Sequence, residues 1–263
     1  MWTKSRVLQH NWDRDERTES TDDEELPRDE ASSYRSIAAK VNYLSLDSPH
    51  LQFAAKSASQ DMAKPTRGSW KRLKRLARFM LGIRSASWVY AFQEEPAVAD
   101  VFGDSDWGGT SRDRRSTSGG AFMLGSHCLK TWSSTQHAIA LSSAEAELYG
   151  MVEGVTRSRG LLDLVVELGM TGLSRNMRVW TDSAAAKSFV SRHGTGRMRH
   201  LQIRDLWIQK EVADGRITCL KIPGHENPAD LMTKSLGISD INSRLDCMGI
   251  KLELLDGSNS KPS

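Results

Sequence analysis

The chain has 263 residues, of which 38% are hydrophobic and 26% charged, so it is long enough for one substantial soluble domain with polar appendages. Its sequence holds no apolar run near the ~20 residues that a membrane helix needs, and no signal-peptide core, so we expect no membrane partner. Three cysteines without paired spacing argue against a disulfide framework and a zinc site. The net charge of +3 combines an acidic N-terminus with a basic remainder, which favours a polyanionic partner.

Residues 1–33 are predicted to form a disordered acidic leader. The run DRDERTESTDDEELPRDE is highly charged and holds few apolar residues, too few to offset the entropy of ordering. Its simplest role is a linker or solvating tail, and the alternative is competition with nucleic acid for the basic part of the chain. We divide the remainder into a helical segment (34–92), a main domain (97–237) and a C-terminal tail (238–263).

The segment 34–92 has helical spacing of apolar residues. Its second half, WKRLKRLARFMLGI, predicts an amphipathic helix from residue 70 to residue 83. The predicted apolar face comprises Trp70, Leu73, Ala77, Met80 and Leu81. The opposite face comprises Lys71, Arg72, Lys74, Arg75 and Arg78. Between residues 35 and 84 there are eleven basic and two acidic residues, a bias that favours contacts with a phosphate backbone over a merely solvated helix face.

The main domain alternates strand-like and helical patterns. Three predicted strands (98–104, 119–124, 128–133) suit an antiparallel meander. Ser142-x-x-Glu145 then has the form of a capping box, which predicts the start of a long helix that ends before Gly169. Later strands (177–181, 217–222) alternate with helices (183–190, 200–213, 228–234). This order predicts a five-stranded mixed α/β sheet, with three antiparallel strands followed by two parallel strands that are reached by crossovers.

Four acidic residues stand at informative places in this pattern. Asp104 and Asp182 end the first and fourth strands, so they would lie side by side if those strands are parallel neighbours. The covering helices could add Glu147 and Asp230. Converging carboxylates are costly to keep ionised without cations, and oxygen-only ligands favour Mg²⁺ or Mn²⁺ over zinc. Each acid also has a structural alternative: a turn with solvated or locally hydrogen-bonded side chains for Asp104, an exposed helix residue for Glu147, and a helix cap or helix N-terminus for Asp182 and Asp230.

The order of several segments resembles a known family. The segments are FGDSDWGG, RRSTSGG, KTWSSTQHAIALSSAEAELYG, VWTDSAAAK, RMRHLQIRDLWIQKEV and NPADLMTKSL. They resemble the ribonuclease H region of copia-type LTR retrotransposon Pol polyproteins. Residues 34–92 resemble the preceding stretch, where the reverse transcriptase ends in its thumb or connection. The polymerase motif Tyr-x-Asp-Asp is absent, so the chain looks like a C-terminal piece of such a polyprotein.

The resemblance implies a ribonuclease H-like fold and a two-metal hydrolase that cleaves the RNA strand of RNA·DNA hybrids. By position, the catalytic and metal-ligating acids are Asp104, Glu147, Asp182 and Asp230, with two Mg²⁺ as cofactors and Mn²⁺ as the alternative. His225 corresponds to a mobile histidine that aids product release, although a solvated loop histidine is an equal alternative. Asp106 and Glu145 are then expected to support the site rather than to bind metal.

The remaining expectations concern partners and rival functions. Arg114, Arg115, Arg197 and Arg199 are expected to contact phosphate, with plain surface arginines as the alternative. The reverse-transcriptase domain of the same polyprotein is an expected partner, and the resemblance implies a cytoplasmic retroelement particle, with the nucleus as the alternative. Two rivals stay open: an inactive or repurposed retroelement fragment that only binds nucleic acid, and another two-metal nuclease, such as an exonuclease or integrase, on the same fold.

Overall fold

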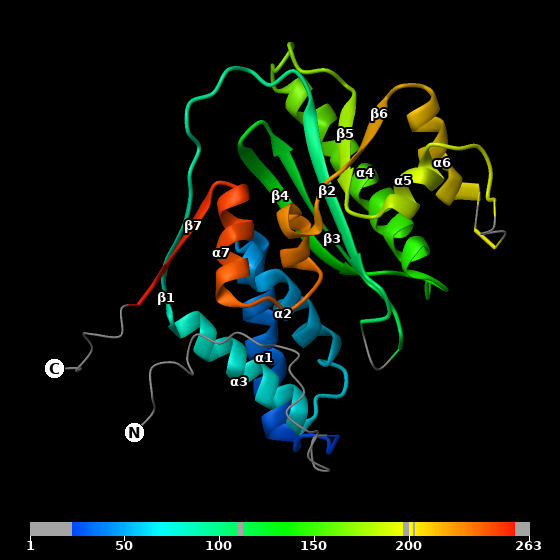
Figure 1. Cartoon of the computed structure of the whole chain (residues 1–263). Coiled ribbons are helices and arrows are strands. Elements are labelled where there is room, and N and C mark those ends of the chain that lie inside the picture. The colour runs from blue at the N-terminus through cyan, green and yellow to red at the C-terminus, as the bar shows by residue number, and fades with distance from the viewer. Residues whose placement is uncertain (1–22, 110–112, 197–199, 202, 256–263) are drawn as a thin grey trace. The chain divides into compact units, whose positions relative to one another are not determined.

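The computed structural model describes residues 23–109, 113–196, 200–201 and 203–255 (Figure 1). The chain divides into two compact units. The first, which we call the helical unit, holds the described residues up to 89 together with 235–246 and 250–255. The second, which we call the sheet unit, holds the described residues from 90 to 234 together with 247–249. In the described part of the chain, no helix has the length and apolarity needed to cross a membrane.

The helical unit contains α1 (Arg28–Leu44), the short 3₁₀ helix η2 (Ser45–Asp47), α2 (Pro49–Gln60) and α3 (Arg67–Leu81). Tyr34 of α1 is fully buried, and its hydroxyl donates a 2.8 Å hydrogen bond to the carbonyl of Ala58 in α2. A capping box formed by Thr66 and Ser69 begins α3 and satisfies backbone groups that a helix start leaves unpaired. The first contact joins α1 to α2, and the second fixes the start of α3.

The start of α1 corrects one prediction. The helix begins at Arg28, so the prediction of disorder over 1–33 is wrong for its last six residues, while residues 1–22 lie outside the described part. Pro27 precedes the first turn, and the acidic side chains of Asp29 and Glu30 lie where the helix dipole favours negative charge. Ala31 is buried, so this turn also has an apolar contact that the charge-rich composition obscured.

Two strands of the helical unit were not predicted either. β1 (Ile83–Trp88) pairs antiparallel with β7 (Ile250–Leu254), and α7 (Ile238–Cys247) precedes β7. The prediction of a wholly helical 34–92 is therefore wrong for β1, because this pairing joins segments far apart in sequence. The buried face of α3 agrees with the predicted one at Leu73 and differs elsewhere: Leu76 and Phe79 are also buried, whereas Leu81 is 75% exposed.

The sheet unit contains the predicted five-stranded sheet. β2 (Ala99–Asp106), β3 (Thr117–Leu124) and β4 (His127–Thr135) are antiparallel neighbours. β5 (Met177–Thr181) pairs parallel with β2, and β6 (Ile217–Lys221) pairs parallel with β5. The strand order is β4-β3-β2-β5-β6, which confirms the prediction of three antiparallel strands followed by two parallel ones. This is a ribonuclease H-like fold.

The helices of the sheet unit follow the predicted order. They are α4 (Ser143–Glu167), α5 (Ala184–Val190), α6 (Ile203–Ala213) and two 3₁₀ helices, η3 (Gly224–Glu226) and η4 (Pro228–Met232). The side chain of Ser142 accepts a hydrogen bond from the Glu145 backbone N–H, as expected of an N-cap. The segment predicted as a final helix is the shorter 3₁₀ helix η4, which begins with the Asn227 cap and Pro228 and ends at Met232.

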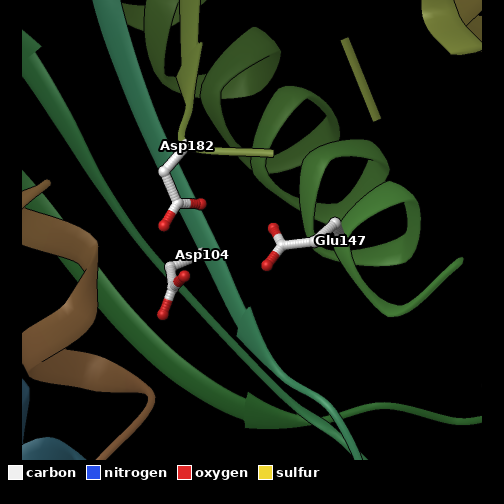
Figure 2. A group of neighbouring side chains, drawn as sticks. All are labelled: Asp104, Glu147 and Asp182. Carbon is white, nitrogen blue, oxygen red and sulfur yellow. The ribbon is translucent and has the colours of Figure 1, made fainter. Parts of the chain in front are cut away.

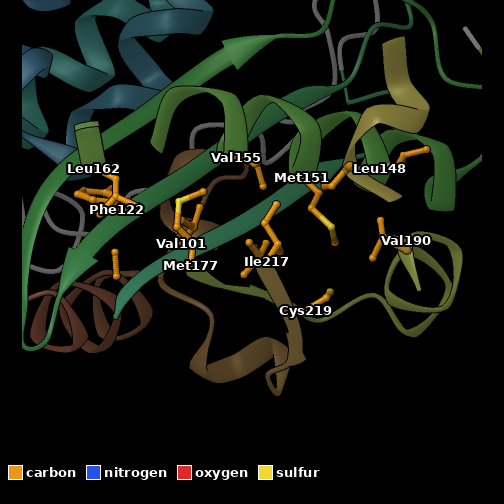
Figure 3. Close-up of a cluster of buried hydrophobic side chains, with 14 of the residues drawn as sticks. Val101, Phe122, Leu148, Met151, Val155, Leu162, Met177, Val190, Ile217 and Cys219 are labelled. Atoms are coloured by element: carbon orange, nitrogen blue, oxygen red, sulfur yellow. The ribbon is translucent and has the colours of Figure 1, made fainter. Parts of the chain in front are cut away.

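A core of buried apolar side chains joins α4 to the sheet (Figure 3). Leu148, Met151 and Val155 of α4 belong to the same cluster as Val101 of β2 and Met177 of β5. All five are at most 3% exposed. Removing such side chains from water contributes roughly 1.5–3 kcal/mol each, so this core holds α4 firmly along the sheet. The orientation of α4 decides where its polar residues point, which matters for the site described next.

Candidate active site

The strand register places Asp104 and Asp182 level with each other. In the parallel pair β2–β5, Phe102 is opposite Trp180, and each aspartate lies two residues farther along its strand. Asp104 is within β2, and Asp182 directly follows β5. The carboxyl ends of these neighbouring parallel strands therefore present two carboxylates at one edge of the sheet, where ligands of open α/β sheets collect.

Glu147 reaches the same edge from the start of α4. The Ser142 cap and the buried Leu148 fix the position and rotation of this first part of the helix. Gly150 lets α4 approach β2 closely, because a Cβ there would lie 3.3 Å from the Asp104 carbonyl oxygen and 3.4 Å from the Ser105 Cβ. The close approach of helix and strand brings the Glu147 side chain to the two aspartates.

These three carboxylates form one group. Asp104, Glu147 and Asp182 each contribute an oxygen atom, and these atoms all lie within 4.8 Å of one another. Figure 2 shows Glu147 extending from α4 toward the two aspartates at the ends of the strands. Asp104 is 3% exposed, whereas Glu147 and Asp182 are half-buried. The structure thus brings together three of the four predicted acids in an arrangement that could hold a cation.

The negative charges of the group are only partly compensated, because one cation, Lys234, lies near the three carboxylates among the residues that the structure describes. Burial, together with the nearby carboxylates of Asp104 and Asp182, raises the pKa of Glu147 to about 9. Burial also raises the pKa of Asp104 to about 6, with Asp230 and Asp182 adding to the rise and Lys234 and Thr233 opposing it. Carboxylates in such surroundings favour binding either protons or a metal ion.

The loop that contains η3 and η4 is fastened to the sheet beside Asp104. The buried Asn227 donates a 3.0 Å hydrogen bond from its amide to the carbonyl of Gly103, and its side-chain oxygen caps η4. Ser133 of β4 donates to the carbonyl of Met232 at 2.6 Å. The hydroxyl of Thr233, at the end of η4, donates to the Asp104 carboxylate. The first two contacts hold the loop against the sheet, and the third fixes the orientation of the Asp104 carboxylate.

Asp230, the fourth predicted acid, lies in η4 and is paired with a lysine. Its carboxylate oxygen is 2.7 Å from the Nζ of Lys234, which in turn is 3.6 Å from the Oδ2 of Asp104. Burial alone lowers the pKa of Lys234, but Asp104 and Asp230 raise it by more, so the ammonium is held charged. Asp230 is thus linked to the acidic group through Lys234 and does not belong to the set of three carboxylates.

His225 lies in η3 and points mostly into solvent. Its side chain is 80% exposed, and its Nε2 is 3.5 Å from a carboxylate oxygen of Glu226. The preceding residue is near the site, because a Cβ on Gly224 would lie 3.1 Å from an oxygen of Asp182. The catalytic role of His225 stays a prediction.

Comparison with known proteins connects this site to a family. The Pol polyprotein of transposon RE2 from Arabidopsis thaliana is 28% identical over 208 residues, which are 78% of this chain. The Pol polyprotein of transposon TNT 1-94 from Nicotiana tabacum is 27% identical over 188 residues, or 71% of this chain. The chain is homologous to the Pol polyproteins of copia-type transposons. It spans only 14% of the length of either relative.

The homology confirms the family resemblance inferred from the motifs. No protein-family model matches the sequence. Among solved structures, the chain is similar to the N-terminal RNase H domain of a Mycobacterium tuberculosis protein, with a TM-score of 0.34 and 19% identity over 52% of this chain and 91% of that one. The fold assignment rests on the strand order and directions of the sheet unit.

Asp106 and Glu145 have structural partners, in line with their predicted supporting roles. A carboxylate oxygen of Asp106 accepts a 2.9 Å hydrogen bond from the backbone N–H of Thr117. The buried Glu145 accepts hydrogen bonds from Tyr149 (2.7 Å) and His200 (2.9 Å). Burial alone raises the pKa of Glu145, yet these hydrogen bonds lower it overall. Glu145 therefore stabilises the start of α4, two residues before Glu147.

The predicted nucleic-acid-binding residues differ in their surroundings. Within α3, Lys71, Lys74 and Arg78 are exposed, while Arg72 forms a 2.7 Å ion pair with Asp61 and Arg75 is half-buried. In the sheet unit, Arg114 and Arg115 are exposed on the segment between β2 and β3. Arg197 and Arg199 lie outside the described residues. The phosphate-binding role of all these residues stays a prediction.

Three residues around Asp104 were not singled out from the sequence: Asn227, Thr233 and Lys234. Their positions depend on contacts between η4 and distant strands, which the sequence pattern does not show. One signal was available for Lys234. It follows Asp230 by four residues, a spacing at which oppositely charged side chains can meet on a helical turn.

Proposed function

We propose that the chain is the ribonuclease H region of a Pol polyprotein and cleaves the RNA strand of RNA·DNA hybrids with the help of divalent metal. The fold and the Pol homologues support a nuclease of the ribonuclease H type. The observation on which the proposal rests is the meeting of Asp104, Glu147 and Asp182 at one edge of the sheet. The cytoplasmic localisation inferred from the family resemblance stays a prediction.

The three carboxylates suit a divalent metal ion. They offer only oxygen ligands, as Mg²⁺ and Mn²⁺ prefer, and their mutual repulsion favours a bound cation. Asp104, Glu147 and Asp182 would hold the first ion. In the two-metal form of the proposal, a second ion would be held by Asp104 and Asp230. A bound divalent cation supplies Lewis-acid chemistry that activates water for attack and stabilises the leaving oxygen of a phosphodiester.

The surrounding residues keep the site in one geometry. Thr233 donates to Asp104, so one oxygen of this carboxylate is held in place while the other can face a ligand. Gly150 brings the backbone of α4 against β2, which fixes the distance between Glu147 and the strand ends. Preorganised charges of this kind contribute to catalysis because they need no rearrangement during the reaction. The expected products are a 3′-hydroxyl and a 5′-phosphate.

The substrate is proposed to bind mainly through phosphates. The exposed cations of α3 and of the β2–β3 segment are candidates for backbone contacts, which are salt-dependent and independent of sequence. Discrimination of RNA from DNA would come from contacts with the 2′-hydroxyl groups in the minor groove.

The test is cleavage of an end-labelled RNA·DNA hybrid by the purified full-length chain, with Mg²⁺ or with EDTA. Duplex DNA and single-stranded RNA serve as comparison substrates. We expect Mg²⁺-dependent cutting of the RNA strand of the hybrid. Asp104→Asn should reduce the rate by roughly three orders of magnitude or more while hybrid binding, measured by fluorescence anisotropy, persists.

Asp163→Asn is a suitable control, because Asp163 is an acidic residue of α4 in an exposed ion pair with Arg175. This variant should cut the hybrid like the unaltered chain. Cleavage that survives Asp104→Asn would contradict the assignment of the site. Hybrid binding without any cutting by the unaltered chain would favour the inactive or repurposed fragment, and preferential cutting of duplex DNA would favour another nuclease of this fold.

A further inference from the structure

The two sides of the acidic site differ in how their charge is balanced. On the side of Glu147 and Asp182, three carboxylates meet within 4.8 Å. On the other side, the Lys234 ammonium lies 2.7 Å from Asp230 and 3.6 Å from Asp104. Asp104 therefore belongs to both sides, through one carboxylate group that is only 3% exposed.

The Lys234 ammonium is held between Asp104 and Asp230, where a cation is needed to balance their negative charges. Its backbone N–H donates to the carbonyl of Asp230, which keeps the turn closed and the side chain directed back along it. The neighbouring Thr233 hydroxyl donates to Asp104, and Asn227 fastens the whole loop to β2. The side chain is 44% exposed, so solvent reaches it.

We propose that Lys234 is a positioning residue, an internal cation that neutralises the Asp104–Asp230 side of the site and competes there with divalent metal. The group of three carboxylates then loads the first ion, and a second ion at Asp230 requires displacement of the ammonium. A positive charge this close to a ligand opposes a divalent cation strongly, because the repulsion acts across a few ångströms of partly buried protein. This inference deepens the proposed function. It rests on that function only for the role of the metal in cleavage, and not for the binding of metal itself.

The test is a titration of the full-length chain with Mn²⁺, in which free Mn²⁺ is measured by electron paramagnetic resonance. No nucleic acid is present, so failure of the cleavage assay and failure of this inference are separate results. Lys234→Met removes the charge and keeps an apolar stem, whereas Lys234→Arg keeps the charge. Lys130→Met is the matched control, because Lys130 is an exposed lysine on β4 and its replacement changes the net charge equally.

We expect one tightly bound Mn²⁺ in the unaltered chain. Lys234→Met should strengthen binding of Mn²⁺ by about tenfold or more, or add a second tight site, while Lys234→Arg and Lys130→Met should stay within about threefold of the unaltered chain. Equal or weaker Mn²⁺ binding by Lys234→Met would overturn the proposal.

A second measurement covers the case of impaired folding. In EDTA, Lys234→Met should unfold at a lower temperature than Lys130→Met, since two buried carboxylates have lost their counter-ion. Saturating Mn²⁺ should remove most of this difference. A lower unfolding temperature that Mn²⁺ does not restore would show a merely structural role for Lys234 and would also overturn the proposal.

Discussion

The acidic site of the sheet unit and the basic face of α3 in the helical unit differ in how firmly the surrounding structure holds their charged side chains. Each carboxylate of the site is positioned by several contacts: strand register for Asp104 and Asp182, and the cap and close approach of α4 for Glu147. Three cations of α3, Lys71, Lys74 and Arg78, are exposed. The Nζ of Lys74 lies over the ring of Trp70 on the same helix, 5.2 Å from the ring centroid.

This difference shows how the two regions should respond to substitution. Buried groups that share one ion act as a unit, so loss of one member should remove most of the function. Exposed cations contribute independently and are screened by salt, so each loss should be small and graded. The predictions below test this contrast.

The largest expected effect comes from Glu147→Gln. Cleavage of the hybrid should fall by roughly three orders of magnitude or more, because the site loses a charged ligand. At the same time, the metal-free chain should become more stable at pH 8, because the variant removes the burial of a charged carboxylate and its repulsion by Asp104 and Asp182, which together raise the pKa of Glu147. Each kcal/mol gained should raise the unfolding temperature by about 2–4 °C, as measured by calorimetry in EDTA.

The pH dependence of stability follows from the same carboxylates. The folded-state pKa is about 9 for Glu147 and about 6 for Asp104, both above the ordinary values of these groups. Above pH ~4.5 the carboxyl groups of Glu147 and Asp104 are ionised in the unfolded chain, while in the folded chain they keep their protons to a higher pH. The folded state is therefore progressively destabilised as pH rises toward 9. In EDTA the unfolding temperature should therefore be lower at pH 8 than at pH 5.5, Mg²⁺ should restore it, and Glu147→Gln should flatten the dependence. A pH dependence that is unchanged in Glu147→Gln would contradict the raised pKa that we assign to Glu147 from its burial and its acidic neighbours.

The smallest expected effect comes from α3. Lys74→Gln and Arg78→Gln should each weaken hybrid binding slightly and reduce the slope of log affinity against log salt by about 0.9. Fluorescence anisotropy over a range of salt concentrations measures both quantities. Lys251→Gln, an exposed lysine on β7 of the same unit, is the control and should leave the slope unchanged. If neither α3 variant alters the slope, this face does not contact phosphate.

The sequence predicted the sheet and four converging acids, of which Asp104, Glu147 and Asp182 meet in the structure, because the strands and the start of α4 depend on local patterns. Met177–Thr181 is an apolar run of strand length followed by Asp182, and the structure has β5 with these same bounds. The capping pattern at Ser142 likewise placed the start of α4 to within one residue. Once β2 and β5 are parallel neighbours with Phe102 opposite Trp180, Asp104 and Asp182 lie at the same level of the sheet and therefore side by side.

The features that the sequence did not predict depend on contacts between distant segments. Lys234 approaches Asp104 only because Asn227 and Thr233 fasten η4 to β2, more than a hundred residues away in sequence. Strand β1 forms only because β7 pairs with it, across a similar separation. A helical pattern in the preceding residues could not reveal that pairing.

The central claim is that Asp104, Glu147 and Asp182 together hold a divalent cation. Crystals of the chain soaked in Mn²⁺ and measured for anomalous scattering test it directly. We predict a peak at metal–ligand bonding distance, about 2.1 Å, from oxygens of these three residues, with Lys234 still beside Asp230 at low Mn²⁺. Absence of a peak there, or a first peak between Asp104 and Asp230 with Lys234 displaced, would contradict the account.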